Sequence, residues 1–142
     1  MPNYWIFPIT QDSLYVSLDK EIVGTRSKNR KRVENWEIGD LIIFYVSREE
    51  YHSMNPVREF QALVECISHP FESNQKIWSH IGGDVFPTRV RIRVVNKKKC
   101  KIMPLIERLS FIKNKKNWGS AFFSGIRKIS QNDFNLIIKA MK

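Results

Sequence analysis

Two stretches near the start of the chain place small polar residues beside aromatic ones. Residues 3–10 read NYWIFPIT, and residues 22–26 read IVGTR. An aromatic strand that ends near a proline, passes through Thr10 into a short amphipathic run and returns at Gly24-Thr25 leaves hydroxyl groups next to aromatic faces. This chemistry suits a pocket for a flat, polar ligand.

The titratable residues form no recognisable catalytic pattern. The three histidines are scattered over expected loops, and they compose neither a nucleophile elbow, nor a phosphate-binding glycine loop, nor a set of metal ligands. Cys66 and Cys100 lack a CxxC spacing and a nearby histidine, so neither a zinc site nor a disulfide framework is indicated. We therefore expect a binding protein without a cofactor rather than an enzyme.

The charge balance favours a polyanionic partner. The 24 Lys and Arg residues exceed the 14 Asp and Glu residues, which gives a formal net charge of +10. A generally basic composition and an anionic membrane surface are the alternatives, but no stretch is long and apolar enough to span a bilayer, and we expect a cytoplasmic protein. Among these explanations of the charge, we favour binding to RNA or DNA. The cations assigned from the sequence to the nucleic-acid backbone are Arg26, Lys28, Arg30, Lys31, Arg32 and Arg89.

Apolar periodicity predicts a small set of strands and helices. The expected strands are residues 3–9, 41–46, 59–67 and 86–95, with a further short strand after the Lys97–Lys99 turn. The expected helices are residues 11–20, a turn near 105–111 and a C-terminal helix that begins at Ser130. Residues 14–18 also alternate as a strand would, and residues 69–84 are expected to form a long loop.

These elements define a fold class. A length of 142 residues fits one domain, which we place at residues 1–142. About five or six strands with short connections and three short helices predict an α+β fold, with a curled, mostly antiparallel sheet or pseudobarrel. The run at 41–46 is continuously apolar, so we expect it to be the central strand and buried on both faces.

Several motifs, taken in chain order, resemble the EVE domain family of the PUA-like superfamily. They are Asn-Tyr-Trp-Ile-Phe at 3–7, Gly24-Thr25, Gly-Asp-Leu-Ile-Ile-Phe-Tyr at 39–45, Ile77-Trp78, Phe-Pro-Thr-Arg-Val at 86–90, Ile129-Ser130 and Asp133-Phe134. The resemblance covers nearly the whole chain and extends to YTH domains. It implies a pseudobarrel with a pocket that takes a single, often modified, base swung out of its strand.

The resemblance also implies roles for individual residues. Ile9-Thr10 stand where the YTH pattern has an apolar residue followed by serine, which implies hydrogen bonds to a base edge. Trp78 stands near the family's second-half tryptophan and is implied to form a wall of an aromatic cage. Arg127 falls where a YTH-like pattern places an arginine against the nucleic-acid backbone.

One departure from the family concerns the aromatic wall. Val23 stands where related domains commonly carry tryptophan, so a ring is missing unless Trp5, Tyr45 or Trp118 replaces it. A base–aromatic stack contributes about 1–3 kcal/mol, so the loss matters for affinity. Trp5 and Trp36 are also reasonable core residues, and a basic loop around Trp118 suits either a stack or a pocket cap.

We therefore predict a module that binds RNA or DNA by capturing one modified base. The predicted pocket residues are Trp5, Ile9, Thr10, Val23, Gly24, Thr25, Tyr45, Trp78 and Trp118, with Arg127 added to the backbone contacts. A binder of a free planar molecule such as a nucleoside is the main alternative, and a protein-interaction module is a third. Dependence of affinity on salt separates the first two.

Overall fold

The computed structural model describes residues 2–26, 29–50, 52–78, 80, 85–123 and 125–142. Its strands are β1 (Tyr4–Ile9), β2 (Ile22–Thr25), β3 (Leu41–Arg48), β4 (Pro56–Cys66), β5 (Phe71–Glu72), β6 (Thr88–Asn96), β7 (Cys100–Lys101) and β8 (Arg127–Ile129). Its helices are α1 (Gln11–Lys20), α2 (Arg30–Glu34) and α3 (Gln131–Ala140), with 3-10 turns η3 (Met103–Leu105) and η4 (Trp118–Phe122).

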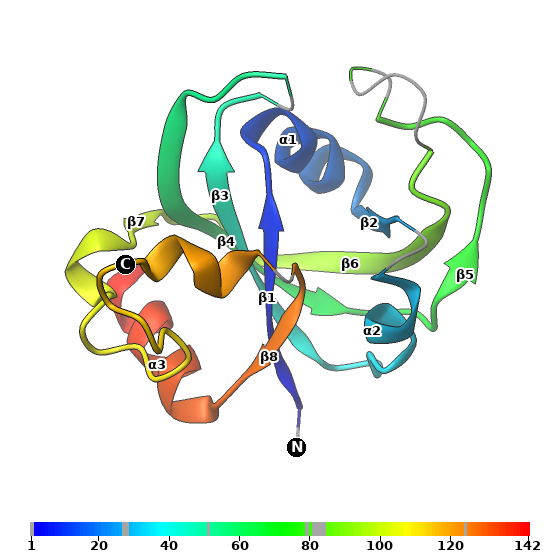
Figure 1. Ribbon diagram of the computed structural model, residues 1–142. Helices are drawn as coiled ribbons and strands as arrows, with labels where there is room; N and C mark the ends of the chain where they lie inside the picture. The colour runs from blue at the N-terminus through cyan, green and yellow to red at the C-terminus, as the bar shows by residue number, and fades with distance from the viewer. Residues whose placement is uncertain (1, 27–28, 51, 79, 81–84, 124) are drawn as a thin grey trace.

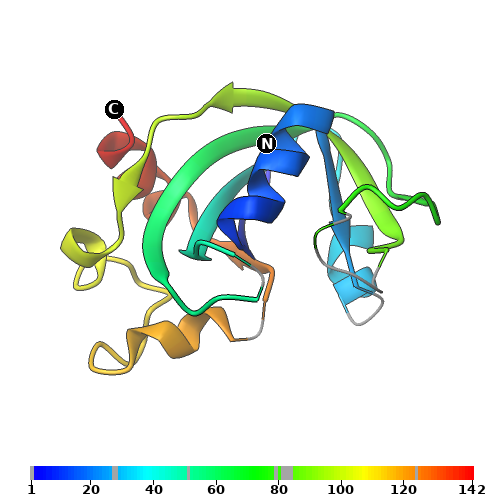
Figure 2. The same cartoon turned by 90° about the horizontal axis from the view of Figure 1, so that it is seen from above.

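The strands form one curled sheet in the order β2-β6-β4-β3-β1-β8, with β5 added to β6 and β7 to β4. All pairs are antiparallel except β1 with β3, whose crossover passes through α1, β2 and α2 (Figure 1). Register shifts in the β3–β4 and β4–β6 pairs accompany the curl, because a bulge bends a strand. Figure 2 shows β4 arching around α1. The predicted curled α+β sheet with short flanking helices is confirmed.

Strand β3 lies at the centre and is buried on both faces, as its apolar run predicts. Ile42, Phe44 and Val46 join the core cluster that α1 and α2 cover, whereas Ile43 and Tyr45 join the cluster that α3 and residues 102–112 cover. The alternation follows from the two-residue period of a strand. One strand therefore supplies side chains to two hydrophobic cores.

Some element boundaries differ from the prediction. Strand β6 begins at Thr88 rather than at Phe86, because Phe86 has a left-handed backbone (φ 50°) that interrupts the extended chain. The expected helical turn near 105–111 is the shorter η3, and the expected long loop contains β5. Within the described part of the chain, no helix has the length and apolar character to cross a membrane.

The carboxylate of Asp40 ties the start of β1 to the turn before β3. Asp40 is 1% exposed and accepts hydrogen bonds from the backbone N–H groups of Asn3 and Glu37 and from Trp5 Nε1, each at 3.0 Å. Three donors compensate the burial of the charge. The same bonds fix the indole of Trp5 inside the core, where it packs against Trp36 with ring centroids 6.1 Å apart.

Ionisation of buried neutral groups predicts an alkaline limit to stability. Burial raises the pKa of the Cys100 thiol from 9.0 to about 11, and burial likewise raises the pKa of the Cys66 thiol and of the Tyr45 phenol. These groups ionise more easily in the unfolded chain, so their stabilising contribution is complete below the unfolded pKa and is lost as pH rises through the folded pKa.

We expect the free energy of unfolding, measured by urea titration, to fall as the pH rises from about 9 to 11. The variant Cys100→Ala should show a shallower fall than the wild type over that window. Identical pH profiles for the two proteins would contradict the assignment to Cys100.

Candidate ligand cavity

A cavity of about 440 Å³ opens between the end of β1, one face of α1, strand β2 and the segment that follows η4. Its volume lies within the range of small-molecule sites, about 300–1,000 Å³. The aromatic residues that line it are Phe7, Trp78, Phe86, Phe122 and Phe123. Phe123 is 82% exposed, so it stands at the mouth, whereas Trp78 is 3% exposed. The cavity thus has a buried aromatic wall and an exposed aromatic rim.

Hydroxyl groups and two arginines make up most of the cavity's polar lining. Four buried hydroxyl residues, Thr10, Ser13, Ser17 and Thr25, line it, and half-buried Arg26 and Arg48 do so as well. No carboxylate belongs to the lining within the residues described. The interior is therefore suited to an uncharged polar ligand, because a cation would find no countercharge there.

Trp78 reaches the cavity only because Gly24 has no side chain. A Cβ built at Gly24 would lie 2.6 and 2.7 Å from two ring carbons of Trp78 and 2.9 Å from the carbonyl oxygen of Phe86. The ring of Phe86 meets the indole edge-on at 5.6 Å between centroids. Gly24 lies in strand β2 rather than in the turn that its type suggests, and the close approach of an aromatic ring requires a glycine there.

Arg89 holds the loop that carries Trp78. Its guanidinium donates to the carbonyl oxygens of Gln75, Val85 (2.8 Å) and Phe86 (3.2 Å) and to Ser73 Oγ (3.1 Å). The guanidinium carbon also lies 5.3 Å from the centroid of the Trp78 ring. Arg89 is 1% exposed, and burial lowers its pKa. The side chain therefore joins both ends of this loop beneath the indole.

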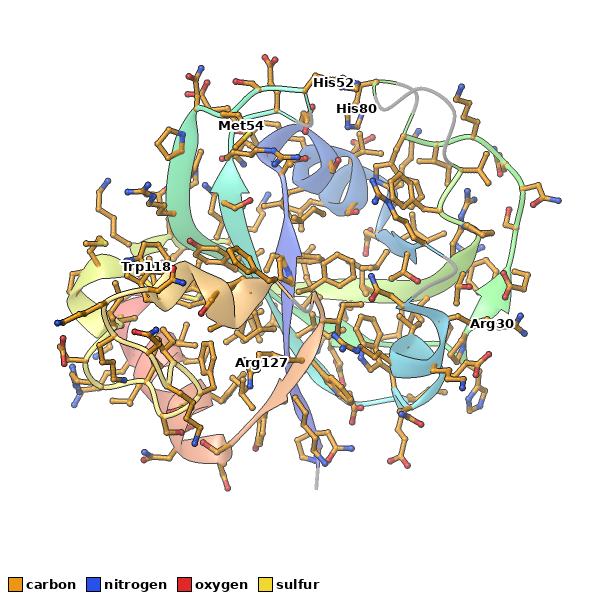
Figure 3. All side chains as sticks on the ribbon, in the orientation of Figure 1. Arg30, His52, Met54, His80, Trp118 and Arg127 are labelled. Carbon is orange, nitrogen blue, oxygen red and sulfur yellow. The ribbon has the colours of Figure 1, made fainter. Side chains whose placement is uncertain are left out.

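A chain of hydrogen bonds connects α1 to His80, in the middle of the same loop. Thr10 Oγ1 donates to Asp12 Oδ1 at 2.6 Å and lies 3.1 Å from Ser13 Oγ. Ser13 Oγ lies 3.0 Å from Nε2 of His80, and that nitrogen is 3.6 Å from Asp12 Oδ2. Figure 3 shows His80 beside the start of α1. Because one nitrogen meets both Ser13 and Asp12, this is not the relay of a serine hydrolase, which uses the two ring nitrogens separately.

The structure brings together six of the residues predicted for binding. Ile9, Thr10, Gly24, Thr25 and Trp78 line the cavity, as does Arg26, which was predicted for the nucleic-acid backbone. These residues come from the end of β1, from β2 and from the loop before β6. The strand–hydroxyl–helix–glycine pattern at the start of the chain therefore locates the cavity.

Four predicted pocket residues lie elsewhere. Trp5 and Val23 are in the core cluster beneath α1 and α2. Phe7 and Thr25, which share their strand faces two residues further on, line the cavity, so position along the strand separates them rather than the face. Tyr45 is buried on the opposite face of the sheet and stacks on Phe122 at 4.0 Å between centroids. Trp118 lies at the far end of η4 (Figure 3), with Arg58 5.7 Å from its ring centroid. None of these four is among the described lining residues.

The predicted backbone cations of the basic run are divided between structural and exposed positions. Lys28 lies outside the described residues. Arg30 is paired with Glu34 and Glu72, at 2.6 and 3.4 Å. Arg32 donates to the carbonyl oxygen of Ile126 at 2.6 Å, and Lys31 is exposed. The run therefore leaves Lys31 better placed than Arg30 to meet a phosphate.

The two remaining predicted cations act within the protein. Arg127 is half-buried, donates to the carbonyl oxygen of Ala121 at 3.0 Å and lies 5.2 Å from the ring centroid of Phe111. Arg89 is enclosed by the loop described above and is 1% exposed, so the prediction that it contacts the nucleic-acid backbone is wrong. Arg91 and Arg93, at alternate positions of the same strand, are exposed.

Sequence reasoning missed several lining residues. Ser17 follows Ser13 by four positions, so the helical period could have placed both on the cavity face of α1. Phe122 and Phe123 come from a segment more than 90 residues away from β2, and no local pattern connects the two. Phe86 was assigned to a strand, although its left-handed backbone turns the chain at the cavity.

Solved structures of low sequence identity share this architecture. The YTH domain of the Zygosaccharomyces rouxii MRB1 protein, in complex with N6-methyladenosine RNA, matches at a TM-score of 0.68 and 16% identity, over 99% of this chain and 87% of that one. Human THYN1, in complex with DNA containing 5-methylcytosine, matches at 0.62 and 11% identity, over 99% and 98% of the two chains. The fold is therefore a PUA-like curled half-barrel.

Sequence comparisons identify the family within this fold class. A UPF0310 protein of Pyrococcus abyssi is 32% identical over 137 residues, which cover 95% of this chain and 96% of that relative. A UPF0310 protein of Bacillus licheniformis is 35% identical over 103 residues, 72% of this chain and 66% of the relative. The model of the EVE domain matches residues 3–140. The chain belongs to the EVE domain family.

The packing of Trp78 on Gly24 predicts a strong effect of one methyl group. We expect Gly24→Ala to lower the free energy of unfolding by about 2–3 kcal/mol, because the indole and the Phe86 backbone must move. Gly119→Ala is the control, since a Cβ there would meet nothing within 4 Å and the change should stay within about 0.5 kcal/mol. Equal stability of the two variants in urea titrations would contradict the packing argument.

The buried bonds of Arg89 predict a second, independent effect. We expect Arg89→Met to cost about 2–4 kcal/mol of stability, because it leaves loop carbonyls without donors. Arg91→Met, two residues along the same strand, removes an exposed guanidinium that lies 5.5 Å from the Phe71 ring centroid, and should cost less than about 1 kcal/mol. Denaturant titrations compare the two, and a larger loss for Arg91→Met would refute the assignment.

Proposed function

We propose that this protein binds single-stranded or locally opened nucleic acid by taking one base, in its preferred form a modified one, into the cavity. The observation that carries the proposal is the combination of aromatic walls with buried hydroxyls and no carboxylate among the described lining residues. A base is flat, uncharged and rich in hydrogen-bonding atoms at its edge, so it matches each of these features.

The lining argues against the other common use of an aromatic cage. Sites for quaternary ammonium groups or methylated lysine use aromatic faces to attract a cation. Here, Arg26 and Arg48 line the same cavity, which makes entry of a cation unfavourable. The same two arginines favour the phosphates on either side of a captured base.

The family and the fold support the choice of a modified base. Two solved structures with this fold, described above, hold N6-methyladenosine RNA and 5-methylcytosine DNA. Transfer of that property to this chain is part of the proposal, because the identities of 16% and 11% show the fold alone. A methyl group that fills apolar space adds about 0.8 kcal/mol of affinity, so discrimination from this term alone is modest.

The aromatic contacts of the captured base would come only in part from the residues that the sequence indicates. Val23 is 1% exposed and packs in the core, so its position supplies no wall. Trp78 supplies the buried wall, and Phe123 supplies the exposed ring at the mouth. Phe122 also lines the cavity, and Tyr45, which lies outside the cavity, stacks on the ring of Phe122 and supports it.

A free nucleoside or similar planar molecule is the second candidate. Two observations favour it: Arg89 is enclosed in the protein, and Arg30 is engaged by Glu34 and Glu72. Fewer cations near the cavity are then available for phosphates than the net charge indicates. Such a ligand would bind with little dependence on salt, because no counterions would be released from a phosphate backbone.

The deciding experiment titrates fluorescent RNA and DNA oligonucleotides, each with and without one N6-methyladenine or 5-methylcytosine, at about 50 and 200 mM salt. We expect a methylated strand to bind best and its affinity to fall steeply with salt. Phe123→Ala should weaken binding of the methylated strand about tenfold, because removing a base–aromatic stack costs about 1–3 kcal/mol.

The control is Tyr15→Ala, which removes a ring that is 59% exposed but lies outside the described lining of the cavity. Its affinity should equal that of the wild type. Binding of a free methylated nucleoside without salt dependence would favour the second candidate. No preference for any methylated strand would contradict capture of a modified base.

A further inference from the structure

The hydroxyl of Ser17 is buried without a partner at the wall of the cavity. Ser17 is 1% exposed, lies in the middle of α1 and lines the cavity. Its Oγ finds no hydrogen-bond partner in the described part of the structure. A mid-helix serine commonly bonds back to the carbonyl one turn earlier, but this one does not. A buried hydroxyl left in this way is unfavourable unless something else satisfies it.

The other buried hydroxyls of the cavity are already bonded. Thr10 donates to Asp12, and Ser13 Oγ lies between Thr10 Oγ1 and His80 Nε2 at 3.1 and 3.0 Å. Thr25 Oγ1 donates to the carbonyl oxygen of Thr88 at 3.5 Å. Among these four, Ser17 is therefore the hydroxyl whose hydrogen is uncommitted.

Location distinguishes Ser17 from the other unpartnered polar atoms. Two more buried side-chain atoms lack a partner in the described residues, Nε1 of Trp36 and Nε of Arg127. Neither residue belongs to the described lining of the cavity. Of these three atoms in the described residues, only Ser17 Oγ lies where a ligand in the cavity would meet it.

We propose that Ser17 is a specificity-determining residue that donates a hydrogen bond to a ring nitrogen on the edge of the captured base. This inference rests on the proposed function and adds the direction from which the base is read. The edge that carries the acceptor faces α1, while the ring lies against the aromatic wall formed by Trp78. A base that lacks this acceptor leaves the Ser17 hydrogen unsatisfied and is rejected.

The first test measures the protein without ligand. Ser17→Ala removes an unsatisfied hydroxyl and improves helix propensity, so its Tm should equal or exceed that of the wild type. The matched control is Ser130→Ala at the N-cap of α3, where Oγ accepts from the N–H of Asp133 at 3.1 Å. That variant should melt at a lower temperature and keep the affinity of the wild type. A clear loss of Tm in Ser17→Ala would overturn the inference, because the hydroxyl would then have a structural partner.

The second test uses the best-binding methylated oligonucleotide and versions of it in which one ring nitrogen of the methylated base is replaced by C–H. The probes are the 1-, 3- and 7-deaza forms of N6-methyladenine, or the 3-deaza form of 5-methylcytosine. We expect one deaza form to bind wild type about tenfold more weakly than the intact base. In Ser17→Ala the intact base should bind about tenfold more weakly than in wild type, and that deaza replacement should then change affinity less than about twofold.

The outcomes separate the two proposals. Equal binding of the intact base by wild type and Ser17→Ala overturns the role of Ser17 and leaves base capture standing. A deaza effect of the same size in both proteins likewise overturns it. If the wild type binds none of the oligonucleotides, the proposed function fails, and the role of Ser17 fails with it.

Discussion

The close packing of Trp78 on Gly24 is the contact on which the cavity depends. The indole can approach β2 only where the backbone carries no side chain, and the guanidinium of Arg89 lies 5.3 Å from the centroid of its ring. Arg89 belongs to β6, the strand that pairs with β2, so one pair of strands fixes both the indole and the loop that carries it. The aromatic wall is therefore as rigid as the sheet, although Trp78 itself lies in a loop.

Helix α1 contributes side chains both to the hydrophobic core and to the wall of the cavity. Leu14 packs into the core beneath the helix, whereas Ser13 and Ser17 line the cavity. Ser13 and Ser17 are four positions apart and share a face, and Leu14 borders that face. Two of the three buried residues of α1 are therefore serines, which explains the weak amphipathic pattern of its sequence.

The sequence predicts the site residues and the burial that depend on neighbouring elements of the chain. It does not predict burial that comes from segments distant in the sequence. Ile9, Thr10, Gly24 and Thr25 could be assigned because β1, α1 and β2 follow one another directly in the chain. The burial of β3 could be predicted from its continuous apolar run, since such a run requires both faces of the strand to be covered. Arg89 could not be assigned, because its strand alternates like an exposed one and only the loop at 73–86 encloses it. In physical terms, burial of a charged side chain depends on contacts that no short window contains.

The position of Val23 shows that strand β2 supplies no aromatic wall to the cavity. Its side chain packs in the core of β2, and its neighbours Gly24 and Thr25 line the cavity instead. The aromatic residues that complete the lining, Phe122 and Phe123, follow from η4, on the opposite side of the opening from β2. Apart from Phe7 of β1, the aromatic residues of the lining therefore come from segments outside the strands, namely Trp78, Phe86, Phe122 and Phe123. We expect these segments to govern which ligand the cavity prefers, whereas the curled sheet fixes where the cavity lies.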